Sequence, residues 1–446
     1  MTSLLKKIAA AVRSFVPGGL IPVLMISGVL LNGCGSEHQE TGKNGIVHLT
    51  YWPSANEYEI NLAVLEVAQW NAAHPKIQIK MQPIPSSQSS EEVLLAAIAG
   101  KTTPDICSNI WPGKMGQFTR AKAVVQLDTF ADFDSLFAAR IPENLIKDSR
   151  YLDGHFYQIP WKTNPVMIQY NVGMFKSAGV DTFPRTYSQY LKAGRKLTRD
   201  LNGDGQIDQW MGIVDVRAKW WVRFFDFYPF YIAASGGQTL LKGRKVLFDT
   251  QASVDVFRFF QTGFNEGIFP RARFQTDPFL MKIVASRFTG PWEIAHTEKY
   301  KPKGLTYDFA QIPLPDGKKG HSYTYGDPKN IVIFSTTKHA YEAWQFVKFL
   351  VTPKADLNLL KLSGQLPVRK GLMEDSLYRP YFRKNPMMVK FAKMIPFTRG
   401  VDSVPEMEEI FDAISLEFEA SAILGKRTPE DAVKRAAKRC RQILIE

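Results

Sequence analysis

Alternating and helically spaced apolar residues follow one another along the first quarter of the chain. Residues 46–52 and 77–81 alternate apolar and polar positions, as half-buried strands do. Between them, apolar residues recur at helical spacing over 60–68. Another helix is predicted over 91–99, and a third strand over 106–110. Strands that alternate with helices predict right-handed βαβ units and a largely parallel sheet.

Similar signals return later in the chain. They predict a strand over 166–170 and helices over 187–197 and 253–264. A last helix is predicted from 428–431, a capping sequence with proline in its first turn. Five basic residues toward the end of that helix complement the helix dipole. We predict a solvated face for them, with a contact to lipid head groups as the alternative: Lys434, Arg435, Lys438, Arg439 and Arg441.

The first residues are typical of a secretory signal. Lys6, Lys7 and Arg13 precede an apolar run over 20–31. Twelve helical residues span only ~18 Å, whereas the hydrocarbon core of a membrane is ~30 Å thick. We therefore predict that this run is a signal rather than a membrane span, with an uncleaved signal anchor as the alternative.

The end of the predicted signal has a lipoprotein pattern. The sequence 31–34 (Leu-Asn-Gly-Cys) resembles the lipobox of bacterial lipoproteins, which implies cleavage before Cys34 and acylation of that residue. We predict a signal peptide over 1–33 and a polar, glycine-bearing tether over 34–44. The mature protein is expected outside the cytoplasm, in the periplasm or at the cell surface, held to a membrane by its lipid.

Composition narrows the possible partners. Lys and Arg outnumber Asp and Glu by 56 to 43, which gives a net charge of +13. Such an excess can favour nucleic acid, an anionic membrane or an acidic ligand. The predicted location outside the cytoplasm argues against nucleic acid. The length of 446 residues suits two or three domain-sized units, and three cysteines exclude a disulfide framework.

Catalytic motifs are largely missing from the sequence. It contains no P-loop, no HExxH pair and no G-x-S-x-G turn. Cys107 and Cys440 are predicted to be packing residues, although their pairing in an oxidising compartment is left open. Glu293 and Asp327 could in principle form the carboxyl pair of a glycosidase. We predict that the protein is not an enzyme and keep a glycan-processing enzyme as the alternative.

One loop has the spacing of a calcium site. Oxygen-bearing side chains stand at alternate positions around Gly205, as in loops that wrap ligands around Ca²⁺. Met211 occupies the position where an EF-hand loop needs a bidentate glutamate. We predict a structural Ca²⁺ and no required cofactor, with a metal-free polar turn as the alternative. The predicted metal residues are Asp200, Asn202, Asp204, Gln206 and Asp208.

Six short segments form a pattern that extends over most of the chain. They are 103–106, 168–187, 286–292, 343–350, 366–369 and 425–430. Together and in this order they resemble the family 1 extracellular solute-binding proteins, the maltose-binding type that serves carbohydrate ABC importers. Each segment is a weak signal alone, whereas the ordered set is specific.

The resemblance implies a fold and a division of the chain. The fold class would be α/β, with two discontinuous lobes joined by hinge strands and a ligand in the cleft between them. The first lobe would comprise 45–160 and 325–370, and the second 161–324 and 371–446. The resemblance also implies a monomer that delivers its cargo to the permease subunits of an importer. Some family members carry a calcium loop in the second lobe, where the predicted loop falls.

Aromatic residues carry the ligand prediction. Flat rings match the apolar faces of sugars, while amide, acidic and basic side chains bind the hydroxyl rim. Trp52 and Trp111 follow predicted strands, at the ends where α/β clefts form. Trp70 and Trp344 stand on helices and are predicted to be core residues. The predicted ligand residues are Trp52, Asn56, Asn109, Trp111, Trp161, Lys162, Trp220, Trp221, Arg223, Trp292, Glu293, Tyr325 and Asp327.

The preferred function is therefore capture of a carbohydrate by lobe closure for an ABC importer. The number of aromatic residues favours an oligosaccharide. Basic residues near the rings, Lys162, Arg217, Lys219 and Arg223, suggest an acidic sugar as a variant. Besides the enzyme, the alternatives are a sensor subunit and a binding protein of the same fold for a non-sugar ligand.

Overall fold

The computed structural model describes residues 45–85 and 90–445. The predicted signal, the tether and Cys34 lie outside these residues and stay predictions. None of the helices in the described ranges is long and apolar enough to cross a membrane.

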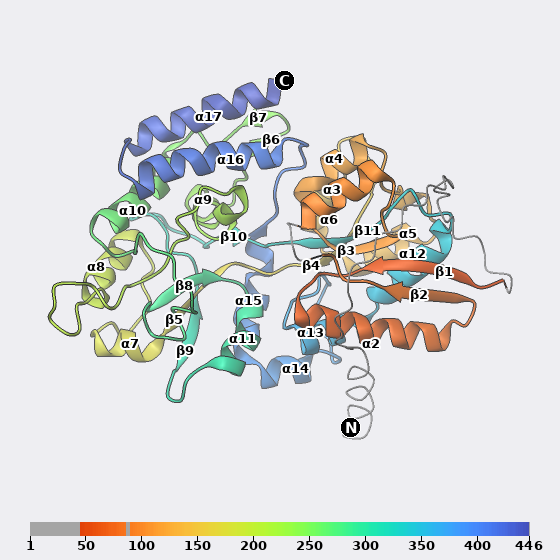
Figure 1. The fold of residues 1–446 in the computed structure, drawn as a ribbon, viewed down its shortest axis with the longest axis horizontal. Helices are drawn as coiled ribbons and strands as arrows, with labels where there is room; N and C mark the ends of the chain where they lie inside the picture. Colours follow the sequence, from red (N-terminus) through yellow and green to blue (C-terminus); the bar gives the residue numbers. More distant parts are fainter. Residues whose placement is uncertain (1–44, 86–89, 446) are drawn as a thin grey trace, which may run out of the picture. The chain divides into compact units, whose positions relative to one another are not determined.

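Five strands form the first sheet, in the order β2-β1-β3-β11-β4. Strand β1 (Val47–Trp52) pairs in parallel with β2 (Ile77–Met81) and with β3 (Ile106–Ile110), so the predicted parallel arrangement is confirmed for these three strands. Strand β11 (Lys329–Ile333) returns from much later in the chain and runs antiparallel to both β3 and β4 (Ile159–Lys162). Figure 1 shows this late strand beside β3. We refer to the part built on this sheet as the first lobe.

Both faces of the first sheet are buried. Successive residues of a strand point to opposite faces, and Ile331 and Ile333 contribute to one hydrophobic cluster whereas Val332 contributes to another. Helices α2 (Glu57–Ala73) and α12 (Ala340–Leu350) pack into the first cluster, and α3 (Ser90–Gly100) packs into the second. Strand β11 accordingly has a run of three buried apolar residues, Ile331 to Ile333, as strands covered on both faces do.

Helix α2 begins where the sequence predicts a change from strand to helix. The Asn56 side chain accepts hydrogen bonds from the backbone amides of Tyr58 and Glu59, which otherwise lack partners in the first turn. The buried face of the helix has the expected helical spacing. It nevertheless includes two acids among its members: Glu59, Leu62, Ala63, Glu66 and Trp70.

Three antiparallel strands form a second sheet, with β5 (Met167–Asn171) between β8 (Ser286–Thr289) and β9 (Tyr307–Ala310). We refer to the part built on it as the second lobe. Strand β10 (Thr324–Tyr325) pairs in parallel with β12 (Thr398–Arg399). The residue limits proposed for the lobes stay a prediction, and β4 and β10 each extend across one of those limits.

The strongly patterned helices form close to their predicted positions. Helix α8 spans Tyr187–Leu197, α10 spans Gln251–Asn265 and α17 spans Pro429–Ile445. The remaining α-helices are α4 (Met115–Arg120), α5 (Phe133–Arg140), α6 (Glu143–Ser149), α7 (Val172–Ser177), α9 (Phe227–Ser235), α11 (Trp292–Tyr300), α13 (Pro353–Ser363), α14 (Arg379–Lys384), α15 (Pro386–Met394) and α16 (Met407–Phe418). Figure 1 shows α17 alongside α16, and the five basic residues of α17 are exposed, as a solvated face requires.

Both described cysteines are packing residues, as predicted. Cys107 and Cys440 are buried and unpaired. Burial raises the pKa of the Cys107 thiol well above its usual range, and it raises the pKa of the Cys440 thiol to about 12. Neither thiol is activated as a nucleophile, because a reactive cysteine needs a lowered pKa.

Candidate functional site

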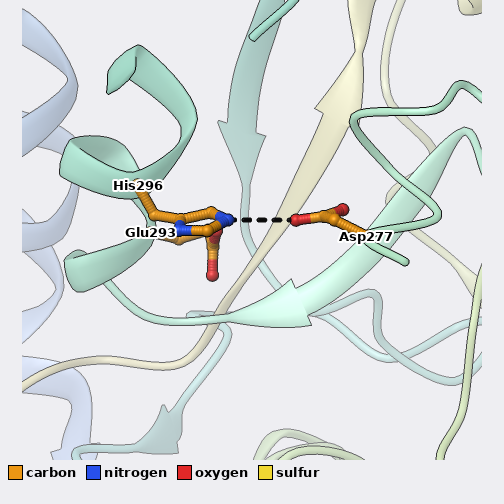
Figure 2. A group of neighbouring side chains, drawn as sticks. All are labelled: Asp277, Glu293 and His296. Carbon is orange, nitrogen blue, oxygen red and sulfur yellow. Dashed lines mark ion pairs between the residues drawn. The ribbon is translucent and has the colours of Figure 1, made fainter. Parts of the chain in front are cut away.

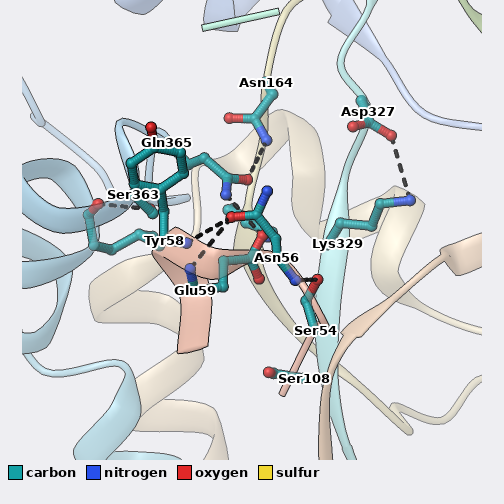
Figure 3. A network of polar contacts seen from close by, with 12 residues as sticks. Ser54, Asn56, Tyr58, Glu59, Ser108, Asn164, Asp327, Lys329, Ser363 and Gln365 are labelled. Atoms are coloured by element: carbon teal, nitrogen blue, oxygen red, sulfur yellow. Dashed lines mark hydrogen bonds and ion pairs between the residues drawn. The ribbon is translucent and has the colours of Figure 1, made fainter. Parts of the chain in front are cut away.

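Hydrogen bonds between buried polar side chains join the start of α2 to two segments that are distant in the sequence. The Asn164 amide donates to Gln365 Oε1 at 2.9 Å, and Gln365 Nε2 donates to Glu59 Oε1 at 2.8 Å. The Lys162 ammonium donates to the same Glu59 oxygen at 2.6 Å. The other carboxylate oxygen, Glu59 Oε2, is buried without a hydrogen-bond partner among the described residues. Figure 3 shows Glu59, Asn164 and Gln365 beside Ser54, Asn56 and Ser108. We call these residues, together with Lys162, Asp327 and Lys329, the polar cluster.

The charges of the polar cluster are balanced. Lys162 pairs with Glu59, and Lys329 pairs with Asp327 at 3.4 Å, as Figure 3 shows for the second pair. Burial lowers the pKa of the Lys162 ammonium, an effect that Glu59 partly offsets. Burial also acts against the charge on Lys329, but Asp327 and more distant acids outweigh it and raise the pKa of this lysine. Two lysines thus face two carboxylates, so the cluster carries no large net charge.

Two residues beside this cluster have strained backbones. Asn109 in β3 has a φ of 67°, and Asp327, just before β11, has a φ of 36°. Side chains other than glycine rarely adopt this conformation, and such strain is concentrated at functional sites. Both residues were predicted to contact a ligand.

Four aromatic rings adjoin the cluster and link it to the second lobe. The centroid of the Trp111 ring lies 5.0 Å from that of Trp220 and 5.2 Å from that of Phe224. Trp111 Nε1 donates to the Tyr325 hydroxyl at 3.2 Å, and that hydroxyl donates to Asp327 Oδ1 at 3.5 Å. We call Trp111, Trp220, Phe224 and Tyr325 the aromatic group. Trp111 follows a strand of the first lobe, yet it is only 2% exposed and packs in the large core cluster of the second.

The structure thus brings together part of the predicted ligand set. The residues at the polar cluster or in the aromatic group are Asn56, Trp111, Lys162, Trp220, Tyr325 and Asp327, while Asn109 follows Ser108 in β3. Sequence reasoning missed Ser54, Glu59, Ser108, Asn164, Lys329 and Gln365. The signal for Glu59 was available, because this acid interrupts the apolar face of α2. The other five give no local signal, since their proximity depends on contacts between distant segments.

Three predicted tryptophans lie elsewhere. Trp161 is buried in the core of the first lobe, with the Lys162 ammonium over its ring. Trp52 is half-buried against the cluster on the other face of the first sheet. Trp221 is 37% exposed and carries the Arg217 guanidinium 4.7 Å from its ring centroid. Whether these rings contact a ligand stays a prediction.

Arg223 lies inside the second lobe. Its guanidinium pairs with Asp226 at 3.1 Å and donates to the backbone oxygen of Asp215 at 2.9 Å. It also lies over the Phe418 ring. These contacts make Arg223 a structural cation that holds the 215–226 loop, and they leave it fully buried. Burial raises the pKa of the Asp226 carboxyl to about 6, although Arg223 favours its charged form.

This shift predicts a pH dependence of stability. The folded protein keeps a proton on Asp226 that the unfolded chain releases above about pH 4. The contribution of Asp226 to the free energy of unfolding should therefore fall, by roughly 2–3 kcal/mol, as the pH rises from about 4 to about 6. Urea denaturation of the parent and of Asp226→Asn should show a difference that changes over this range and is constant above it. Parallel pH profiles would contradict the prediction, and exposed Asp181→Asn is the control.

Trp292 and Glu293 begin α11, beside a group that could be taken for a metal site. The Trp292 ring contacts Phe225 edge-on, with 6.0 Å between the centroids. Figure 2 shows Asp277, Glu293 and His296, the one group of three potential metal ligands found among the described residues. Arg287 already donates to Asp277 at 2.9 Å and to Glu293 at 2.7 Å. The guanidinium supplies the positive charge that these carboxylates need, so we interpret the group as an ion network.

The predicted calcium loop is an exposed turn held by its own backbone. The Asp200 carboxylate accepts hydrogen bonds from the amides of Asn202, Gly203 and Gly205, and Asp208 accepts one from Leu201. The same side-chain oxygens that would bind Ca²⁺ thus organise the loop. The three carboxylates do not form a group of converging ligands among the described residues. Calcium binding stays a prediction.

Two cavities lie near the candidate site. The larger, about 660 Å³, is bounded by the strands that join the lobes and includes Thr163, Asn330 and Arg399 in its wall. The smaller, about 390 Å³, lies in the second lobe between Trp221 and Phe274. Both volumes are within the range of small-molecule sites.

Comparison with known proteins identifies the family. The model of the bacterial extracellular solute-binding proteins matches residues 58–356. A binding protein of Brucella abortus is 24% identical over 421 residues, 90% of this chain and 97% of the relative. The sn-glycerol-3-phosphate-binding periplasmic protein UgpB of Escherichia coli is 23% identical over 431 residues, 90% of this chain and 93% of that protein.

A solved structure confirms the fold. The maltose/maltodextrin-binding domain MalE of Bdellovibrio bacteriovorus, bound to maltotriose, superimposes with a TM-score of 0.73 at 20% identity, covering 90% of this chain and all of that one. The α/β fold is therefore of the periplasmic-binding-protein type, as predicted. Because the family model matches most of the chain, the protein belongs to the bacterial extracellular solute-binding protein family.

Proposed function

We propose that the protein is the substrate-binding component of an ABC importer and captures a carbohydrate outside the cytoplasm. Membership of the solute-binding family carries this proposal. Ligand contacts with both lobes would favour the closed state by the difference in affinity between closed and open forms. The closed form would then dock on membrane permease subunits. The lipid anchor at Cys34, the structural calcium and the monomeric state remain parts of the proposal that rest on the sequence.

The candidate site suits a hydroxyl-rich ligand. Trp220, the partly exposed ring of the aromatic group, matches the apolar face of a sugar, and the amides of Asn164 and Gln365 can both donate and accept. The partnerless Glu59 Oε2 is a buried acceptor that needs a donor, and a sugar hydroxyl can supply one. Because the matching family model is one of solute-binding proteins, we propose binding without chemistry.

The charge balance favours a neutral sugar over an acidic one. Three of the four basic residues that suggested an acidic ligand are paired: Lys162 with Glu59, Arg217 with Asp215, and Arg223 with Asp226. An anionic ligand would therefore meet carboxylates as well as cations. The number of aromatic residues in the sequence favours an oligosaccharide over a monosaccharide. A phosphate ester is the second candidate, because the Escherichia coli relative is named for sn-glycerol-3-phosphate.

Thermal unfolding of the purified full chain, carrying Cys34→Ser, tests this proposal. Neutral oligosaccharides, uronides and sn-glycerol-3-phosphate are added separately, each with calcium and with chelator. A ligand at a hundredfold excess over Kd should stabilise the folded state by ~2.7 kcal/mol. We expect a rise with a neutral oligosaccharide that is recovered intact. A rise with the phosphate ester alone would replace the sugar proposal, and turnover of the sugar would contradict it.

A pair of variants locates the binding site. Asn164→Ala removes an amide from the polar cluster and should abolish most of the ligand-induced rise. Asn71 lies near the opposite end of α2, and Asn71→Ala removes an amide that hydrogen-bonds with the backbone of Ile79. This control should lower the melting temperature without changing the ligand-induced increment. Equal ligand-induced rises in melting temperature in both variants would show that the ligand binds outside the polar cluster.

A further inference from the structure

A second set of contacts between the lobes lies outside the polar cluster and the aromatic group. The short helix η1 (Pro112–Lys114) and helix α4 follow β3 in the first lobe. They contact the segment that leads into α16, a helix of the second lobe. Gln117 Nε2 donates to the Pro405 backbone oxygen at 2.9 Å, and Arg120 pairs with Glu406 at 3.3 Å.

An ion pair between a buried lysine and a partly exposed glutamate forms part of the same surface. The Lys114 ammonium pairs with Glu408 and donates to Gln117 Oε1 at 3.2 Å. The Lys114 side chain is 2% exposed although it comes from a short surface helix. Burial raises the pKa of the Glu408 carboxyl, while Lys114 favours its charged form. This ion pair depends strongly on its geometry, because the Lys114 charge alone would be costly to bury.

Gly116 permits the close approach of the two segments. A Cβ atom at this position would lie 2.7 Å from the backbone nitrogen of Pro405 and 3.0 Å from its Cα. Real Cβ atoms do not approach backbone atoms this closely, and no side-chain rotation can relieve the overlap. Even the smallest side chain at position 116 must therefore push the two surfaces apart.

We propose that Lys114, Gly116, Gln117, Pro405 and Glu408 form a closure clasp, which sets the stability of the closed state without contacting the ligand. The inference rests on the proposed function, in which the lobes close on a ligand. Contacts in the clasp stabilise the closed state by the same free energy whichever ligand is bound. Weakening them should lower the affinity for every ligand by a common factor and leave selectivity unchanged.

A distance measurement tests the clasp without any ligand. Spin labels at Ala121→Cys and Leu416→Cys, both exposed, lie on the two sides of the clasp. The full chain carries Cys34→Ser, and the remaining cysteines are buried. Pulsed electron paramagnetic resonance compares the labelled parent with Gly116→Ala. Overpacking costs of this kind should change the ratio of closed to open forms roughly tenfold. We expect a population at longer distance in the variant.

A matched glycine and a second variant complete the test. Gly100→Ala introduces the same methyl group at the end of α3, where the nearest atom would lie at an ordinary 3.5 Å, and it should leave the distances unchanged. Glu408→Gln keeps the shape of the clasp but removes its charge, and should also lengthen the distance. Unchanged distances in both clasp variants, with cooperative melting retained, would overturn the inference. Because no ligand is added, failure of the sugar panel would not affect this result.

Discussion

Replacing Glu59 by alanine should lower the free energy of unfolding by about 3–5 kcal/mol. The substitution leaves the Lys162 ammonium, which is 1% exposed, without the carboxylate that balances its charge. It also removes the acceptor of the Gln365 amide. Urea denaturation measures the loss. The same variant should show no ligand-induced rise in melting temperature, because the partnerless acceptor oxygen is also lost.

Glu57 provides the matched control for this experiment. It stands two positions earlier on the same helix, and its side chain is 69% exposed. Glu57→Ala should therefore change the free energy of unfolding by no more than about 0.5 kcal/mol. A similar small effect of Glu59→Ala would show that Lys162 finds another partner or loses its proton, and the proposed role of the polar cluster would need revision.

Replacing Asp356 by alanine should have an effect of similar size in a different place. This fully buried carboxylate pairs with Arg140 and with Arg369, the latter at 2.5 Å. Arg140 also donates to the backbone oxygens of Val351 and Trp161, so that one network joins four segments of the first lobe. Removing the acid leaves two guanidinium groups without a counter-charge. We expect a loss of about 3–5 kcal/mol in urea denaturation.

A compensating variant separates loss of charge from loss of packing. In Asp356→Leu combined with Arg140→Met and Arg369→Met, apolar groups of similar length replace all three charged residues. Such replacements are often neutral or better, so the triple variant should recover much of the stability lost by Asp356→Ala. A triple variant as unstable as Asp356→Ala would show that the backbone hydrogen bonds of Arg140 matter more than its charge. Exposed Asp181→Ala is the control.

Local pattern was enough to predict most of the elements that position the site. The strands 47–52, 77–81 and 106–110 and the helix 187–197 lie almost where periodicity indicates, since each has a consistent buried face. Helix α3 ends at Gly100, one residue beyond the predicted end at 99, and the left-handed conformation falls on Lys101, with φ of 54°. The choice between adjacent residues depends on hydrogen bonds of the last turn, which include Thr102 to Ala97.

Longer-range features were beyond local pattern. No signal within residues 329–333 shows that this strand inserts antiparallel between β3 and β4. For the same reason, Asn164 and Gln365 could not be assigned to the site, because each acquires its role from a segment far away in sequence. The tryptophans were easier to predict as ligand residues, since a large aromatic residue directly after a predicted strand is a clear local signal. Burial does not follow from that signal, because the Trp161 ring is packed in the core of the first lobe, and its contact with a ligand stays a prediction.

The position of β11 has a consequence for how the chain is made. The first sheet runs β2-β1-β3-β11-β4, so β3 and β4 share no edge until β11 arrives. During synthesis the whole second sheet emerges before that strand does, because β5, β8 and β9 all precede Lys329. The nascent first lobe therefore stays incomplete while most of the polypeptide leaves the ribosome. Contacts of such high sequence separation fold slowly, so the first sheet can be completed only after about three quarters of the chain has been made.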